Sequence, residues 1–240
     1  MYEERKYRGW VKHRDLVPFN VMVEETDLMI LCDTDLSVKA TEFIKKHRKQ
    51  IKDYIFHHKG FAESLKPLKI SHNAPQIVKD MAKASSSADV GPMASVAGVM
   101  AEYVGKDLLN LSSQVIVENG GDIFIKSDKE RLMGIYAGKS PFTGKLDMKI
   151  KPEQTPLGIC TSSGTVGHSL SYGKADAVIT ISKTTALADA VATAAGNVVK
   201  SAHDIQKGVD FARNIDGIDG VVVIVGDKIG AWGNVELTGK

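Results

Sequence analysis

Residues 158–197 read GICTSSGTVGHSLSYGKADAVITISKTTALADAVATAAGN and combine a loop of small residues, a strand and a helix. The β-branched run 177–181 predicts the strand. A helix then begins near Thr184 or Thr185, and either side chain can serve as its N-cap. Because residues 186–199 are mostly Ala, Val and Leu, we expect this helix to be buried and closely packed against a sheet.

Three polar side chains interrupt this apolar helix. Asp189, Thr193 and Asn197 follow one another at intervals of four residues, which aligns them along one face. Asp189 and Thr193 offer two oxygens one turn apart, and such oxygens suit Mg²⁺, which completes its shell with water and phosphate oxygens. The alternative is that neighbouring groups satisfy them: a lysine or a backbone N–H for Asp189, and the helix's own backbone for Thr193.

The composition of the whole chain sets limits on the class of protein. With 240 residues, 43% hydrophobic and 25% charged, the chain is expected to be an ordinary soluble globular protein, and its net charge of +2 gives no reason to expect nucleic acid as a partner. No apolar run approaches the roughly 18 residues of a membrane helix, so we expect a cytoplasmic protein without a membrane partner. Cys32 and Cys160 lie far apart, and we expect both to be buried small hydrophobic residues.

Outside the central stretch, strand and helix patterns alternate irregularly. The Asn-Gly-Gly turn between the apolar runs 115–117 and 123–125 is a strong hairpin signal, since glycine readily adopts positive φ. Further hairpins are expected at 19–32 and 221–232, a strand at 132–137, and helices at 37–55, 75–84, 92–105 and 205–213. This pattern predicts an α+β fold with mixed sheets and packed helices, in place of a regular doubly wound fold.

Four short motifs occur in order between residues 85 and 200: DVGPMA at 89–94, ENGGD at 118–122, TSSG at 161–164 and ADAVATA at 188–194. Together they resemble the D-x-G turn, N-x-GGD hairpin, T-S-G loop and A-D-A-x-A-T-A helix of the ApbE family of FAD-dependent protein flavinyltransferases. The similarity is greatest to an archaeal and bacterial branch of that superfamily. The resemblance implies a single ApbE-like domain over residues 1–240.

The resemblance also implies roles for individual residues. It makes Asp189 and Thr193 ligands of Mg²⁺ next to an FAD or FMN phosphate, and it implies transfer of the FMN half to a hydroxyl of a protein acceptor. His168 is the candidate general acid or base, with a purely structural role as its alternative. The flavin or nucleotide site would be lined by small and polar residues: Asp89, Gly91, Asn119, Gly120, Gly121, Asp122, Thr161, Ser162, Ser163 and Gly164.

Two elements of the transferases are missing. Residues 95–98 contain no lysine where the family has a Lys-Gly pair, and His168 is not followed by an Asp-Pro pair. Two interpretations therefore stay open. The first is a Mg²⁺-dependent enzyme that acts on a flavin or another nucleotide pyrophosphate, as a transferase or a hydrolase; the second is a non-catalytic module that binds a flavin or another small ligand. A flavin-dependent oxidoreductase component is a third, weaker hypothesis, and a homodimer is the default assembly.

Overall fold

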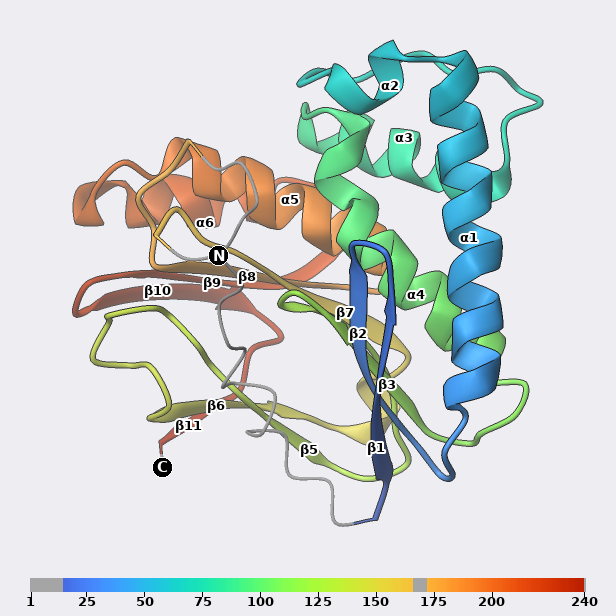
Figure 1. The fold of residues 1–240 in the computed structure, drawn as a ribbon. Coiled ribbons are helices and arrows are strands. Elements are labelled where there is room, and N and C mark those ends of the chain that lie inside the picture. The colour runs from blue at the N-terminus through green and yellow to red at the C-terminus, as the bar shows by residue number, and fades with distance from the viewer. Residues whose placement is uncertain (1–14, 166–171, 240) are drawn as a thin grey trace.

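The computed structural model describes residues 15–165 and 172–239, which form three layers (Figure 1). An eight-stranded sheet is the middle layer, helices cover one of its faces, and a three-stranded sheet covers the other. The order of strands in the large sheet is β1 (Val17–Val23), β2 (Thr26–Cys32), β3 (Val115–Asn119), β4 (Asp122–Lys126), β7 (Leu157–Ser162), β8 (Ala177–Ser182), β9 (Ile218–Val225) and β10 (Lys228–Gly233). The order in the small sheet is β11 (Leu237–Gly239), β6 (Leu146–Ile150) and β5 (Arg131–Gly134).

The predicted α+β class is confirmed. Every strand pair in the described residues runs antiparallel, so these sheets are uniform in direction where mixed ones were expected. The hairpins at β1–β2, β3–β4 and β9–β10 are confirmed. Strands β6 and β11 were not predicted, because both are short and β6, LDMKI, alternates only weakly between apolar and polar residues.

The helices pack on one face of the large sheet. They are α1 (Ser37–His57), α2 (Gly60–Glu63), α3 (Gln76–Ala88), α4 (Val96–Leu108), α5 (Thr185–Val198) and α6 (Ile205–Arg213), with short 3₁₀ turns at Pro92–Ser95, Pro152–Gln154 and Ala202–Asp204. One apolar core lies between these helices and the sheet, and a second lies between the two sheets. Alternate residues of β2 face the two cores, as period-2 geometry requires: Ile30 joins the first and Leu31 the second.

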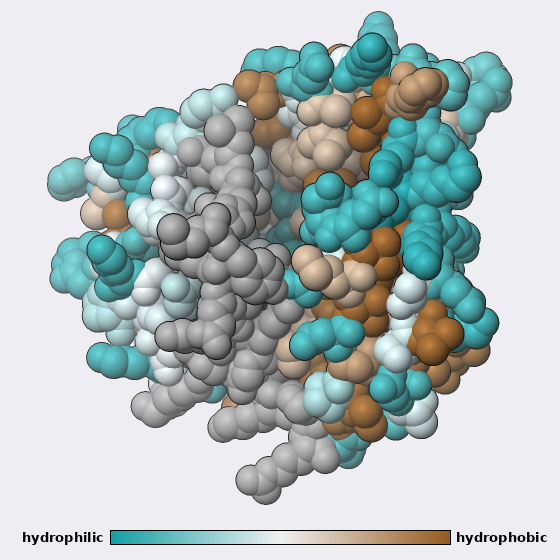
Figure 2. Space-filling view, in the orientation of Figure 1, coloured by the Kyte–Doolittle hydropathy of each residue, from teal (hydrophilic) through white to brown (hydrophobic). Residues whose placement is uncertain are grey.

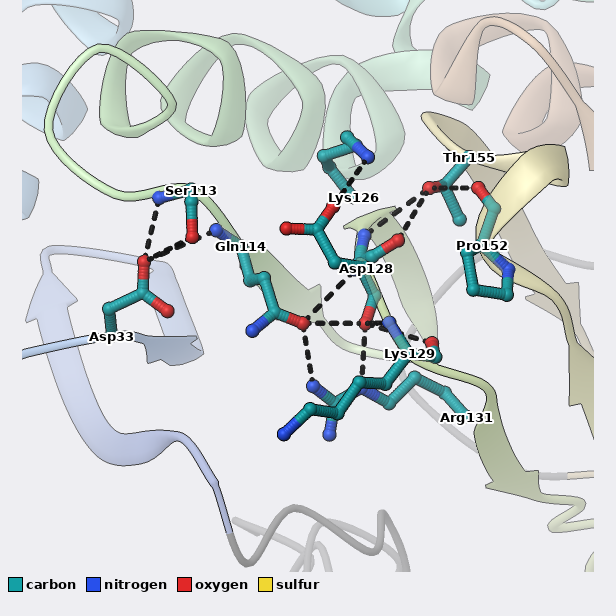
Figure 3. A network of polar contacts seen from close by, with 10 residues as sticks. Asp33, Ser113, Gln114, Lys126, Asp128, Lys129, Arg131, Pro152 and Thr155 are labelled. Atoms are coloured by element: carbon teal, nitrogen blue, oxygen red, sulfur yellow. Dashed lines mark hydrogen bonds and ion pairs between the residues drawn. The ribbon is translucent and has the colours of Figure 1, made fainter.

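A buried arginine ties the small sheet to the large one. Arg131 in β5 forms two hydrogen bonds with Asp15, at 2.7 and 2.9 Å, and it donates to Ser127 Oγ. It also donates to Gln114 Oε1 (Figure 3). Its side chain is only 3% exposed. Because a buried guanidinium without partners would be strongly destabilising, this network fixes the position of β5 relative to β3 and β4.

The exposed side of α1 is largely hydrophilic (Figure 2). Val38 and Phe56, near its two ends, are exposed apolar residues. Its lysines are exposed, and several of them form ion pairs with acidic residues, including Lys39 with Glu42 and Lys49 with Asp53. In the part of the chain that the structure describes, no helix is both long enough and apolar enough to cross a membrane.

Candidate functional site

Helix α5 packs unusually closely on β7 and α4. Cys160 of β7 contacts the small residues Ala188 and Ala192 of α5, and these three form a buried cluster. A Cβ atom added to Gly158 would lie 2.4 Å from Thr185 Cα, and one added to Gly98 would lie 2.6 Å from Thr185 O. The expectation of a buried, closely packed helix is therefore confirmed. Glycine is required on both sides of its first turn.

This packing brings Asp189 of α5 near Asp122 of β4. Ile123 pairs with Ile159 across β4 and β7, so Asp122 lies beside Cys160, the residue on which α5 rests. Asp122 is 6% exposed and Asp189 is partly buried. The geometry thus joins two motifs far apart in the sequence, the Gly-Gly-Asp hairpin and the Ala-Asp-Ala helix.

The two carboxyl groups affect each other's ionisation. Burial, and then the charge of Asp189, raise the pKa of Asp122 well above its ordinary value. Burial also raises the pKa of Asp189 to about 7, while hydrogen bonds from the Gly98 and Ala97 backbone act in the opposite direction. In the described part of the chain, no lysine or arginine forms an ion pair with either carboxylate. Two acidic groups without a cationic partner favour a bound cation.

One oxygen of each carboxylate has a distinct environment. Asp189 Oδ2 accepts a 2.8 Å hydrogen bond from the backbone N–H of Gly98, which fixes the orientation of that carboxylate. Asp122 Oδ1 is buried and has no hydrogen-bond partner in the structure. A buried carboxylate oxygen without a partner is costly unless a ligand satisfies it. This orphaned oxygen is the observation that best marks a ligand site here.

The donor set fits Mg²⁺ better than zinc. Among the described residues, no group of three His, Cys, Asp or Glu side chains is arranged to hold a metal ion. Structural zinc needs four such ligands and catalytic zinc three, whereas Mg²⁺ uses one or two carboxylates together with water and phosphate oxygens. Thr193 lies one helical turn after Asp189 and is partly buried, so its hydroxyl is a third candidate oxygen.

The turn between β3 and β4 borders this site. Gly120 and Gly121 have φ values of 66° and 105°, which side-chain-bearing residues rarely adopt. Gly121 N–H donates to Glu118, and Asn119 Nδ2 donates to Ala97 O at the start of α4. The turn that leads into Asp122 is therefore held against the start of α4.

The loop after β7 adjoins the same turn. A Cβ added to Gly121 would have Thr161 O as its nearest neighbour, at 3.6 Å, so the two segments lie side by side. Ser162 lies near Gly196 of α5, and Thr165 N–H donates a 3.1 Å hydrogen bond to Ser163 Oγ. Gly164 N–H donates to Ala175 O. The structure thus brings the motifs at 118–122, 161–164 and 188–194 together.

The motif at 89–94 is placed differently. Asp89 ends α3 with φ 52° and is exposed, and its carboxylate pairs with Lys66 at 3.0 Å. Gly91 packs against the backbone, since an added Cβ would lie 1.7 Å from Ser64 O. In the described part of the chain, neither Asp89 nor Gly91 forms a hydrogen bond or ion pair with Asp122 or Asp189. His168 lies outside the described residues, and Asn197 accepts a hydrogen bond from Tyr172 N–H.

The sequence did not point to two further residues, Cys160 and Glu102, as part of this site. Cys160 is confirmed as a buried residue, but its thiol also lies beside Asp122, and burial and the two carboxylates raise its pKa. A protonated thiol of this kind is a poor nucleophile. Glu102 of α4 accepts hydrogen bonds from the backbone of α5 at Thr185 and Ala186. Thr184 occupies the predicted N-cap position, but its side chain forms no cap; Glu102 supplies it.

Comparisons with known proteins identify the family of the chain. The family model described as AbpE bacteria matches residues 8–228 of the chain. The chain belongs to this family. Relatives of this member of the AbpE bacteria family include a UPF0280 protein of Methanococcus aeolicus, 41% identical over 90% of this chain and 89% of that protein. A UPF0280 protein of Methanocaldococcus jannaschii is 40% identical over 94% and 92% of the two chains.

Solved structures share the fold of this family member at low identity. The apo flavinyl transferase ApbE of Pseudomonas stutzeri superposes with a TM-score of 0.60 at 13% identity, over 90% of this chain and 94% of that one. The ApbE protein of Thermotoga maritima gives a TM-score of 0.64 at 13% identity, over 90% and 96%. The predicted ApbE-like fold is confirmed, and so is the resemblance to an ApbE-like branch.

Proposed function

We propose that this protein binds Mg²⁺ between Asp122 and Asp189, together with the pyrophosphate of a flavin nucleotide or a similar nucleotide. The observation that carries the proposal is the buried, partnerless Oδ1 of Asp122 beside a second carboxylate whose pKa is raised. A divalent cation would satisfy that oxygen and relieve the repulsion between the two charges.

Different residues would bind the cation and the phosphate in such a site. Asp189 presents a carboxylate whose orientation the Gly98 N–H fixes, and Thr193 presents a hydroxyl one turn later. Gly120 and Gly121 carry no side chain, so a phosphate group can approach their backbone closely. When bound, Mg²⁺ would neutralise negative charge on phosphate oxygens, which favours displacement of a phosphate leaving group.

The flavin part of the proposal is supported by the fold and by the motifs that the site unites. Solved proteins of this fold include flavinyl transferases, although at 13% identity they establish the fold alone. The segment at 161–164, which adjoins Gly121, would face the nucleotide. A protein acceptor hydroxyl and a homodimer belong to the same proposal as further predictions.

A non-catalytic binding protein is the second candidate, and one observation favours it. Residues 95–98, where the transferases carry a lysine, form the start of α4 and present no cationic side chain; Ser95 there is fully buried. A missing lysine removes a charge that could stabilise a leaving phosphate. A non-catalytic protein of this kind would bind the cation and the nucleotide without converting the nucleotide to products.

Calorimetric titration with FAD, FMN and ADP, each with and without Mg²⁺, tests the proposal. We expect binding of FAD that requires Mg²⁺, and loss of that binding in Asp189→Asn. Asp53→Asn, which alters an exposed carboxylate on α1, is the matched control and should bind like the parent. Mass spectrometry of the FAD samples separates the candidates: release of AMP indicates transfer or hydrolysis, and intact FAD indicates a binding protein. FAD binding that does not require Mg²⁺ and is unchanged in Asp189→Asn would contradict the assigned site.

A further inference from the structure

Helix α5, which carries Asp189, has no cap of its own. The first N–H groups of a helix lack partners within the helix, and a side chain at the N-cap normally satisfies them. In α5 the carboxylate of Glu102, from α4, accepts the N–H of Thr185 at 2.7 Å and that of Ala186 at 3.3 Å. Glu102 is only 4% exposed. A buried side chain from another helix thus caps α5.

Helix α4 is capped by α5 in return. Its own N-cap, Ser95, forms no side-chain cap, whereas Asp189 Oδ2 accepts the N–H of Gly98 in the first turn of α4. Gly98 and Glu102 lie one turn apart on α4, and Thr185 and Asp189 lie one turn apart on α5. We refer to the two contacts, Glu102 with Thr185 and Gly98 with Asp189, as the α4–α5 clamp.

The clamp leaves the start of α5 little freedom to move. Thr185 is wedged between two glycines: a Cβ on Gly98 would lie 2.6 Å from its carbonyl oxygen, and a Cβ on Gly158 would lie 2.4 Å from its Cα. In such close packing a small rotation of the first turn of α5 shifts Asp189, one turn later, by a comparable amount. The contact made by Glu102 therefore bears on the position of the proposed cation ligand.

The charge of Glu102 suits this role. A carboxylate at a helix N-terminus is stabilised by the helix dipole and forms short, charge-assisted hydrogen bonds with backbone N–H groups. Its other oxygen, Oε1, accepts a 2.6 Å hydrogen bond from Lys106, whose side chain is 56% exposed. Lys106 offsets the cost of burying the carboxylate and leaves Oε2 free for α5.

We propose that Glu102 is a positioning residue for the cation site: by capping α5 it holds Asp189 in the orientation that binds Mg²⁺. This inference rests on the proposed function, because it needs a cation at Asp189. Glu102 lies outside all four sequence motifs. It would position Asp189 through a contact between two helices.

The test compares Glu102→Ala and Glu102→Gln with the parent by calorimetric titration of Mg²⁺ in the presence of ADP, at a temperature where all are folded. Loss of a residue that orients a metal ligand typically weakens metal binding about 10- to 100-fold, and we expect this for Glu102→Ala. Glu102→Gln should recover part of the loss, because its amide oxygen still accepts one N–H without the charge. This rescue also keeps the test valid if Glu102→Ala does not fold.

The control is Asp33→Asn, which removes the charge from another carboxylate that accepts backbone N–H groups. Asp33 accepts hydrogen bonds from the N–H groups of Ser113 and Gln114 (Figure 3), and neither of these residues belongs to α4 or α5. We expect its thermal stability to fall while its affinity for Mg²⁺ stays that of the parent. Equal affinity of the parent and both Glu102 variants would overturn the positioning role and leave the proposed function standing. A parent that binds no Mg²⁺ would overturn both.

Discussion

Replacing Asp189 with asparagine should stabilise the protein in the absence of metal. The native carboxylate has a pKa of about 7 against an ordinary value of 3.8, with burial as the main cause. The folded state therefore keeps a proton that the unfolded chain loses at lower pH. Stability falls as pH rises from about 4 to about 7, and it remains reduced at pH 8. Asparagine has no charge and avoids this cost.

The size of the effect follows from that difference. The pKa of Asp189 is about three units higher in the folded protein than its ordinary value, which corresponds to about 4 kcal/mol of lost stability at high pH. This figure is an upper bound because Asp189 is partly exposed to solvent. The asparagine oxygen can still accept the Gly98 N–H, but a neutral acceptor loses about 1 kcal/mol relative to a charged one. We expect a net gain of about 1–3 kcal/mol at pH 8, and almost none at pH 4.

Urea denaturation in EDTA at pH 4, 6 and 8 measures this gain directly. The difference between variant and parent should grow with pH. Excess Mg²⁺ at pH 8 should stabilise the parent and leave Asp189→Asn unchanged, because only the parent retains both carboxylates. A variant that is less stable than the parent at pH 8, or a difference independent of pH, would refute the account of a strained acidic pair.

Three further substitutions test the surrounding structure by urea denaturation. Gly98→Ala should cost about 1–3 kcal/mol, because its Cβ would lie 2.7 Å from Asp189 Cβ; parental stability would show that α4 and α5 can separate. Gly121→Ala, at φ 105°, should cost about 1–3 kcal/mol, and an unchanged midpoint would argue against backbone strain there. Arg131→Met should cost on the order of 3 kcal/mol by removing the buried guanidinium that pairs with Asp15 and donates to Ser127 and Gln114, and a loss under about 1 kcal/mol would mean that the network is dispensable.

The elements of the fold with strong local signals could be predicted from the sequence. Helix α5 has a small apolar composition that favours burial, and the Asn119-Gly120-Gly121 turn requires the positive φ values that the structure shows. Strands β6 and β11 could not be recognised in the same way. They are short, and their burial depends on the other sheet, which no local pattern reveals.

The candidate site could be predicted only in part. The helical interval between Asp189 and Thr193 is a local property, so their shared face followed from the sequence. The approach of Asp122 to Asp189 depends on the pairing of β4 with β7 and on the packing of α5 over Cys160, both of which are tertiary. Glu102 was missed for a related reason: capping rules consider nearby residues such as Thr184, and here the cap comes from a different helix.

Anomalous diffraction from crystals grown with Mn²⁺ and FAD tests the central claim most directly, because Mn²⁺ replaces Mg²⁺ at oxygen-rich sites and can be located by its own signal. The proposed site predicts one strong peak within coordination distance of Asp122 and Asp189, adjoining phosphate density near Gly121. A peak at other residues, or none beside these carboxylates when FAD is bound, would contradict the claim that this acidic pair is a cation site.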